Sequence, residues 1–223
     1  MEDLTLYLLA LIIPLIASFR VHSTYKKYKK VNNALGKSGF EVAREMLDQH
    51  GLNEVAIVDT PGELTDHYDP KAKMVRLSTE IYNGRTVSSL AIAAHECGHA
   101  IQDKEGYSWM KLRSAIFPVV NIGTKIAYVV LFVSLILSMF ELFIAAFVIV
   151  LLSLVFEIIT LPVEFDASKR AKKYLMEKGI VNNDEAKGVK KVLNTAAWTY
   201  VAAVISSLLE MLRLLLIMND RRD

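Results

Sequence analysis

Three residues near the middle of the chain have the types and spacing of a metal-binding motif. The stretch AIAAHECGHAIQ, residues 91–102, contains His-Glu-x-x-His as His95, Glu96 and His99. On a helix, residues four apart lie on one face, so both imidazoles can bind one metal ion. Glu96 projects beside the first ligand, where a carboxylate can take a proton from water that zinc has activated. The pattern favours zinc-dependent hydrolysis over two ordinary histidines on a helix surface.

A catalytic zinc site needs a third protein ligand and an open position. The acidic candidates near a predicted membrane surface are Glu105, Glu157, Glu164 and Asp166. Glu164 is the best placed because it lies just past Pro162, at the end of an apolar run. Asp166 points roughly opposite to Glu164 on a helix, so only one of the two can be the ligand. The alternative for Glu164 is an interfacial charge that binds no metal.

Three other residues have side chains that could take part in such a site. His67 could stabilise an oxyanion or line the cleft, but a water-exposed turn histidine is the simpler interpretation. Tyr200 could donate a hydrogen bond to a tetrahedral intermediate, although an interfacial aromatic anchor is favoured. Cys97 lies two residues past His95, so its sulfur points away from the metal and we expect a packing residue. As the single cysteine it also excludes an intramolecular disulfide.

Apolar helices dominate the elements that must position these residues. The chain has 223 residues and is 53% hydrophobic, and its apolar residues concentrate in a few runs. Two adjacent runs, 117–139 and 142–162, would each extend roughly 30–35 Å as a helix. Only Phe140-Glu141 separates them. They predict a helical hairpin that enters and leaves the membrane on one side, rather than two core helices of a soluble domain.

The first apolar run, 4–19, predicts another membrane helix and its orientation. Basic residues follow it, from Arg20 to Lys37, and the first acid after the run is Glu41. The positive-inside rule therefore places the N-terminus outside and the following residues in the cytoplasm. Basic residues on both sides of the hairpin agree with this orientation. A cleaved signal peptide is disfavoured because acidic residues precede the run.

The last apolar segment, 198–218, is ambiguous. Thr199, Ser206, Glu210 and Arg213 form one polar stripe on an otherwise apolar helix. Ionisable groups at membrane depth usually face the bundle interior and pair, and Glu210 and Arg213 can pair across one turn. The segment is either a fourth span or a helix that lies at the membrane interface.

The remaining residues predict a small mixed domain. Ser38 and Glu41 form a capping-box pattern before a helix that ends near Gly51. The strands EVAIVD and KMVRLS flank a turn, and residues 64–78 predict a hairpin. KMVRLS is either the sheet edge that a substrate extends or part of a structural hairpin. Thr86 or Ser88 can cap the helix that carries the histidines to about Lys104.

Four stretches together resemble the YugP-type bacterial membrane zinc metallopeptidases, a family of neutral zinc metallopeptidases. They are TDHYDPKAKMVRLS, YNGR, AAHECGHAIQ and LPVEFDASKRA, and the resemblance covers nearly the whole chain. More distantly, the order of parts is similar to the HtpX-type and CAAX-prenyl-protease gluzincins. This resemblance implies a minimal zincin core with His95, His99 and Glu164 as zinc ligands and Glu96 as general base.

One position departs from the pattern of the distant group. That group reads Glu-Phe-x-Ala-Asp around its third ligand, and its Asp supports a histidine ligand. Here Ser168 occupies the position of that Asp. A serine can form a hydrogen bond but carries no negative charge. The resemblance therefore leaves two options: Asp166 supports a histidine from a different angle, or this subgroup does without the acid.

We therefore predict a mainly α integral membrane protein with three to four transmembrane helices and a small zincin-like α+β catalytic domain in the cytoplasm. The predicted segments are a transmembrane helix at 4–21, a cytoplasmic part at 22–113, a transmembrane hairpin at 116–162, cytoplasmic helices with the third ligand at 163–197, and a transmembrane or interfacial helix at 198–218.

The predicted function is a multi-pass zinc endopeptidase of the bacterial cytoplasmic membrane, with Zn²⁺ as cofactor and its active site on the cytoplasmic face. Its expected partners are the lipid bilayer and membrane or membrane-proximal protein substrates. The net charge of +2 argues against nucleic acid. The main alternative is a zinc-stabilised membrane interaction module without catalysis, which would have no use for Glu96. A divalent-metal transporter would need more ligands at membrane depth.

Overall fold

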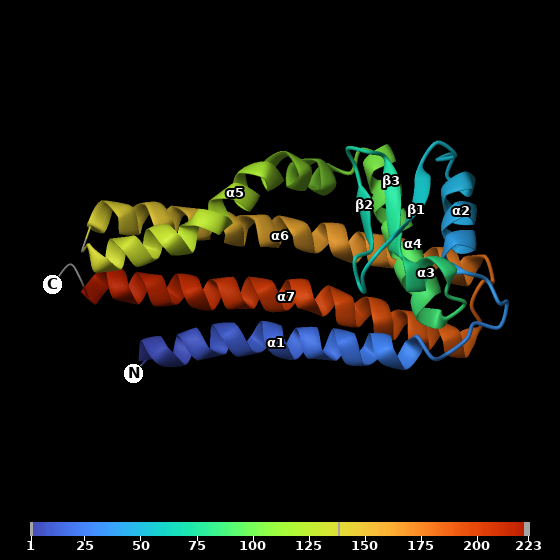
Figure 1. The fold of residues 1–223 in the computed structure, drawn as a ribbon, viewed down its shortest axis with the longest axis horizontal. Coiled ribbons are helices and arrows are strands. Elements are labelled where there is room, and N and C mark those ends of the chain that lie inside the picture. Colours follow the sequence, from blue (N-terminus) through green and yellow to red (C-terminus); the bar gives the residue numbers. More distant parts are fainter. Residues whose placement is uncertain (1, 138, 221–223) are drawn as a thin grey trace. The chain divides into compact units, whose positions relative to one another are not determined.

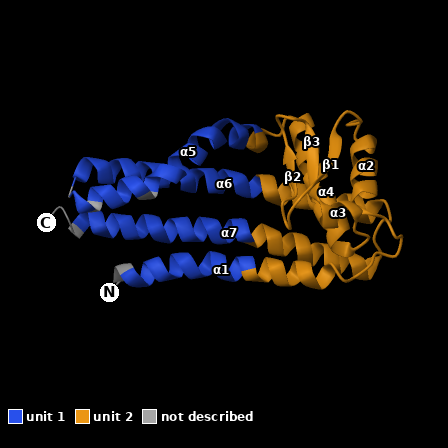
Figure 2. Cartoon of the chain, viewed as in Figure 1, with its two compact units in different colours: residues 1–18, 111–162, 199–223 blue, residues 19–110, 163–198 orange. Residues whose placement is uncertain are grey.

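The chain divides into two compact units (Figure 2). Unit 1 comprises Met1–Ser18, Lys111–Pro162 and Thr199–Asp223, and unit 2 comprises Phe19–Met110 and Val163–Trp198. The structure, a computed structural model, describes residues 2–137 and 139–220. Residue 138 of the predicted hairpin therefore lies outside the described residues.

The apolar runs lie on long helices, whose course is shown in Figure 1. These helices are α1 (Glu2–Tyr28), α5 (Ser108–Ile136), α6 (Phe140–Glu177) and α7 (Asn183–Asp220). Each of the four contains a candidate membrane span by length and composition, and the candidate in α7 includes the ambiguous segment 198–218. At this level the prediction of a mainly helical chain with three to four apolar spans is confirmed.

Helix α6 passes through Pro162 without a break. Proline removes one backbone hydrogen bond, but apolar helices of membrane length tolerate this loss when neighbouring groups compensate. As a consequence Glu164 does not begin a new element. It lies on the same helix as the apolar run before it, so the regular geometry of α6 sets its position relative to that run.

Unit 1 has its own apolar core. Buried side chains from α5, α6 and α7 meet there: Leu131, Phe143, Ala146, Val150, Leu154, Met211 and Leu214. Polar groups on α7 make contacts within the unit. Ser206 Oγ donates to the Ala10 carbonyl at 2.5 Å, and Arg213 pairs with Glu210 at 2.6 Å. Arg213 also lies over the Tyr7 ring, 5.3 Å from its centroid. The predicted pairing of Glu210 with Arg213 is confirmed.

Unit 2 contains a three-stranded sheet with the order β1-β3-β2. Strand β1 (Ala56–Thr60) runs parallel to β3 (Met74–Ser78), and β2 (His67–Asp69) runs antiparallel to β3. The predicted hairpin is confirmed. The option that KMVRLS forms a sheet edge for a substrate is wrong, because β3 is the central strand and its backbone pairs on both sides.

Helices α2 (Gly39–Gln49), α3 (Thr79–Asn83) and α4 (Val87–Lys104) complete this part of unit 2. Ser38 and Glu41 form the predicted capping box, and Thr86 caps α4 by accepting from the Ser89 backbone N–H. Most side chains of α4 are buried. The helix that carries the histidines is therefore held in the unit's main apolar core and is not a surface helix.

Candidate metal centre

Helix α4 presents the His-Glu-x-x-His residues, and a glycine lets α6 approach it. A Cβ atom added to Gly98 would lie 2.9 Å from the Ala167 carbonyl oxygen and 3.1 Å from the Ala167 Cα. Any larger residue at position 98 would force the two backbones apart. The motif's glycine thus permits the contact that brings α6 beside the histidines.

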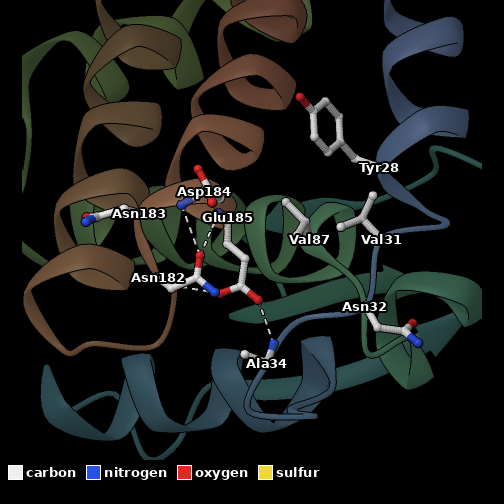
Figure 3. Close-up of a pocket in the computed structure, with 9 residues that line it drawn as sticks. All are labelled: Tyr28, Val31, Asn32, Ala34, Val87, Asn182, Asn183, Asp184 and Glu185. Atoms are coloured by element: carbon white, nitrogen blue, oxygen red, sulfur yellow. Dashed lines mark hydrogen bonds between the residues drawn. The ribbon is translucent and has the colours of Figure 1, made fainter.

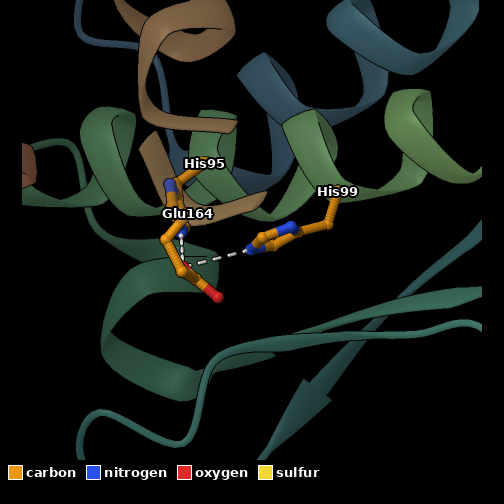
Figure 4. Close-up of side chains that lie close together, drawn as sticks. All are labelled: His95, His99 and Glu164. Carbon is orange, nitrogen blue, oxygen red and sulfur yellow. Dashed lines mark hydrogen bonds and ion pairs between the residues drawn. The ribbon is translucent and has the colours of Figure 1, made fainter. Parts of the chain in front are cut away.

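Helix α6 adds Glu164 to the two histidines (Figure 4). Glu164 Oε2 lies 3.2 Å from His95 Nε2 and 3.6 Å from His99 Nε2. The three ligand atoms all lie within 4.8 Å of one another. Glu164 and His99 are buried, with 2% and 6% of their surface exposed, and His95 is half-buried. Three polar, ionisable side chains therefore meet at one largely buried point, where apolar packing alone would not place them.

The spacing from Glu164 to each of the two histidine nitrogens fits zinc. In a tetrahedral site with bonds of about 2.0–2.1 Å, two ligand atoms lie roughly 3.3–3.5 Å apart. The distances of 3.2 and 3.6 Å from Glu164 to the imidazole nitrogens bracket that value. Two neutral imidazoles and one carboxylate form a typical catalytic ligand set, which leaves a fourth position for water or substrate.

The electrostatic field at His99 favours positive charge. Burial lowers the pKa of the His99 imidazole, but the negative charges of Glu164 and Glu96 and the hydrogen bonds to Glu164 and Gln102 outweigh it and raise the pKa to about 9. Glu96 is itself 8% exposed and lies on the same helix. A divalent cation between these carboxylates would satisfy the same field that favours a proton on His99.

Each histidine has a partner at its second ring nitrogen. Ser168 Oγ lies 3.2 Å from His95 Nδ1, and Gln102 Oε1 lies 3.0 Å from His99 Nδ1. Ser168 is only 3% exposed. Asp166 accepts a hydrogen bond from Gln102 Nε2 at 2.9 Å, so it reaches His99 through the glutamine. Ser168 thus contacts His95 directly, whereas Asp166 reaches His99 only through Gln102.

Sequence reasoning missed Gln102, although it stands at the end of the stretch AIAAHECGHAIQ. Its position three residues after His99 places both side chains on the same helix face. That spacing was the available signal. It was not decisive, because a surface glutamine is common on a helix and only the packing of α6 buries this one.

Sequence reasoning also missed Asp66, which lies in the loop before β2. The Asp66 carboxylate accepts hydrogen bonds from the Ser78 backbone N–H at 2.7 Å and from the Ser78 hydroxyl at 3.1 Å. Burial raises the pKa of the Asp66 carboxyl to about 6; the Ser78 hydrogen bonds oppose this shift and the charge of Glu96 adds to it. A further carboxyl group therefore lies within electrostatic reach of Glu96.

Cys97, His67, Glu105 and Tyr200 lie outside the three-ligand cluster. Cys97 is fully buried with its sulfur 3.6 Å from the Ala43 carbonyl oxygen, and burial raises the pKa of its thiol. This agrees with a packing role. His67 is exposed at the start of β2, and its Nδ1 lies 2.8 Å from the Thr65 carbonyl oxygen. Glu105 pairs with Arg170. Tyr200 belongs to the α7 segment of unit 1.

A separate pocket of about 600 Å³ lies in unit 2 (Figure 3). Its lining residues are Tyr28, Val31, Asn32, Ala34, Val87, Asn182, Asn183, Asp184 and Glu185. The Glu185 carboxylate accepts from the Ala34 N–H at 2.6 Å and from the Asn182 N–H at 2.8 Å. This buried acid therefore ties the start of α7 to the loop after α1, which accounts for it structurally.

The described residues combine apolar helices of membrane length with a His-His-Glu cluster, a combination that fits a membrane metallopeptidase. The chain matches the family described as "Putative neutral zinc metallopeptidase" over residues 4–219, and it belongs to that family. Zinc is the cofactor of this family. The chain is 44% identical over 207 residues to the "Putative membrane protease YugP" of Bacillus subtilis (strain 168), covering 93% of this chain and 92% of that protein. No solved structure matches the chain.

Proposed function

We propose that this protein is a zinc-dependent endopeptidase of the membrane, with His95, His99 and Glu164 as the metal ligands and Glu96 as the general base. The observation that carries the proposal is the convergence of the three ligand atoms beside Glu96, on a site where the charges of Glu164 and Glu96 favour a cation. Family membership and the similarity to a named membrane protease support the same activity.

The mechanism assigns a separate task to each carboxylate. Bound zinc would lower the pKa of a water molecule to about 7 and polarise the scissile carbonyl. Glu96 accepts the proton that this water loses as its oxygen attacks the carbonyl carbon. When the C–N bond breaks, Glu96 returns the proton to the amine nitrogen. Glu164 stays ionised throughout as a ligand, so it cannot replace Glu96 as the base.

The substrates that we propose are membrane or membrane-proximal proteins. Four candidate spans would keep the protein in the bilayer, and Glu164 follows one of the apolar runs directly on α6. The basic residues after the first run predict that the site faces the cytoplasm. A peptide bond presented close to the inner bilayer surface would then be the bond within reach.

Two substitutions test this proposal in the purified, detergent-solubilised protein. Glu96→Gln keeps the shape of the side chain but cannot accept a proton, so we expect full zinc content and a loss of about 10²- to 10⁴-fold in cleavage of an unfolded membrane-protein substrate. Glu164→Ala should lose both zinc and cleavage. Glu177→Ala, at the exposed end of the same helix, is the matched control and should retain both.

Two results would contradict the proposal. Equal cleavage by the wild type and Glu96→Gln would exclude the peptidase mechanism and favour a zinc-stabilised interaction module. Full zinc occupancy in Glu164→Ala would move the third ligand to another residue. Metal content is measured by elemental analysis and cleavage by fragment detection, so the two assignments are tested separately.

A further inference from the structure

Gln102 occupies a fully enclosed position between the two ligand-bearing helices. Its side chain is 0% exposed. Its amide nitrogen donates to the Val163 carbonyl oxygen at 2.8 Å and to Asp166 Oδ2 at 2.9 Å, and its amide oxygen lies 3.0 Å from His99 Nδ1. Both N–H groups and the oxygen of this amide are therefore used.

The orientation of the Gln102 amide follows from its neighbours. A backbone carbonyl and a carboxylate only accept hydrogen bonds, so the NH₂ group must face them. The amide oxygen must then face His99, and it can only accept. His99 Nδ1 therefore carries a proton, and in the neutral imidazole that binds a metal this leaves the lone pair on Nε2, the nitrogen that faces the proposed metal position.

Gln102 also acts on the helix that carries the third ligand. Val163 directly precedes Glu164, and its carbonyl oxygen is one of the two acceptors of the Gln102 amide. The second acceptor, Asp166, is held in turn by Arg170 Nε at 2.6 Å, and Arg170 pairs at 2.8 Å with Glu105, the residue that follows the end of α4. The two helices are thus cross-linked on both sides of Glu164.

We propose that Gln102 is a positioning residue of the metal centre, which fixes the tautomer of His99 and the register of Glu164 with one side chain. The inference rests on the proposed ligand set, because it takes His99 and Glu164 as ligands. It explains why a neutral amide stands here. Glutamate could accept from His99 but could not donate to α6, and leucine could do neither.

The first test is the zinc affinity of Gln102→Leu, measured on the full chain in detergent by competition with a coloured chelator. Loss of a group that orients a ligand typically lowers metal affinity about 10- to 100-fold, and we expect that loss here. Gln49→Leu is the matched control, because Gln49 is an exposed glutamine at the end of α2. It should bind zinc like the wild type.

If Gln102→Leu does not fold, a second test exchanges the hydrogen-bond donor and acceptor between positions 102 and 166. Gln102→Glu alone places a second carboxylate against Asp166 and should weaken zinc binding about 10-fold or more. Adding Asp166→Asn supplies an amide donor on α6, while the new carboxylate still accepts from His99. We expect the double variant to recover part of the affinity, because the hydrogen bond to the Val163 carbonyl oxygen stays lost, and the visible spectrum of bound Co²⁺ should move toward that of the wild type.

Two outcomes would overturn the inference. One is a folded Gln102→Leu whose zinc affinity lies within about threefold of Gln49→Leu. The other is a double variant that binds zinc no more tightly than Gln102→Glu. Zinc binding without any peptidase activity in the wild type would instead refute the proposed function and leave the role of Gln102 standing.

Discussion

The two histidines of the centre are oriented by uncharged groups, Ser168 and Gln102. A carboxylate in such a position raises the basicity of the imidazole, whereas a hydroxyl or an amide fixes its orientation without adding charge. The negative charge around the site comes instead from Glu164 and Glu96, with Asp66 within electrostatic reach of Glu96. The serine in place of an acid is therefore compatible with a complete set of oriented ligands.

At the residue scale, Asp66 is expected to make the stability of the fold depend on pH. Its folded-state pKa of about 6 lies above the ordinary value of 3.8, so the folded protein holds this proton more tightly than the unfolded chain. Ionisation of Asp66 therefore costs stability as the pH rises through 4 to 6. We expect Asp66→Asn to gain stability relative to the wild type over that range, on the order of 1–3 kcal/mol. Thermal unfolding between pH 4 and 7 measures it.

Asp69 provides a control, because its pKa is shifted in the opposite direction and its effect on stability changes with pH in the opposite sense. Hydrogen bonds from the Ala72 and Lys71 backbones, together with Arg76, hold the pKa of the Asp69 carboxyl below its usual value. Its contribution to stability is present above the unfolded pKa and is lost as the pH falls. Asp69→Asn should therefore lose stability relative to the wild type as the pH rises. A pH-independent difference for Asp66→Asn would refute the assignment for Asp66.

At the scale of elements, the close approach of α4 and α6 decides the geometry of the site. Gly98 lies at this contact, and a methyl group there would meet the Ala167 backbone at 2.9 Å. Backbone atoms cannot move aside as the end of a flexible side chain can. The crossing therefore holds Glu164 and the histidines together only as long as position 98 lacks a side chain.

Gly98→Ala should weaken zinc binding and lower stability. Alanine favours a helix over glycine by about 1 kcal/mol, but overpacking against a backbone costs about 1–3 kcal/mol and displaces α6. Zinc affinity and thermal unfolding measure the two effects. Gly123→Ala on α5 is the control, because its methyl would meet only the Ile149 side chain, at 3.1 Å. Wild-type zinc affinity in Gly98→Ala would show that zinc binding does not depend on the close approach of α4 and α6 at this position.

At the scale of the whole molecule, exposed aromatic residues mark the points where the chain passes from one unit to the other. Phe19, Trp109, Phe165 and Trp198 lie within a few residues of these boundaries and are 74%, 44%, 50% and 63% exposed. Aromatic side chains are enriched at membrane–water interfaces. This pattern supports unit 1 as the part that the bilayer surrounds.

The orientation in the membrane can be tested by labelling single cysteines. Cys97 is the only natural cysteine, so Cys97→Ala gives a background without thiols. We expect an impermeant maleimide to label Glu141→Cys in intact cells, because the start of α6 is predicted to lie outside. Lys27→Cys, in the last turn of α1, should label only after permeabilisation. The reverse pattern would invert the orientation and place the site outside.

Features of this protein that depend on interactions between residues close in sequence could be predicted from the sequence. The spacing of His95 and His99, the caps at Ser38 and Thr86, and the apolar runs depend on neighbours within a few residues, and the structure has each of them. Glu164 could be proposed as a ligand only because the length of a hairpin limits where the chain returns. Its distance to the histidines depends on how α4 and α6 pack, across 69 residues of sequence.

Only the tertiary structure decided the contacts that join distant segments. The central place of β3 depends on a parallel partner earlier in the chain, and no local pattern distinguishes a central strand from an edge strand in so short a sheet. Gln102 and Asp66 look like surface residues in the sequence, but α6 buries Gln102 and Asp66 is half-buried with its carboxylate bonded to Ser78. Residue type and period determined which groups could do chemistry here, and long-range packing decided which of them meet.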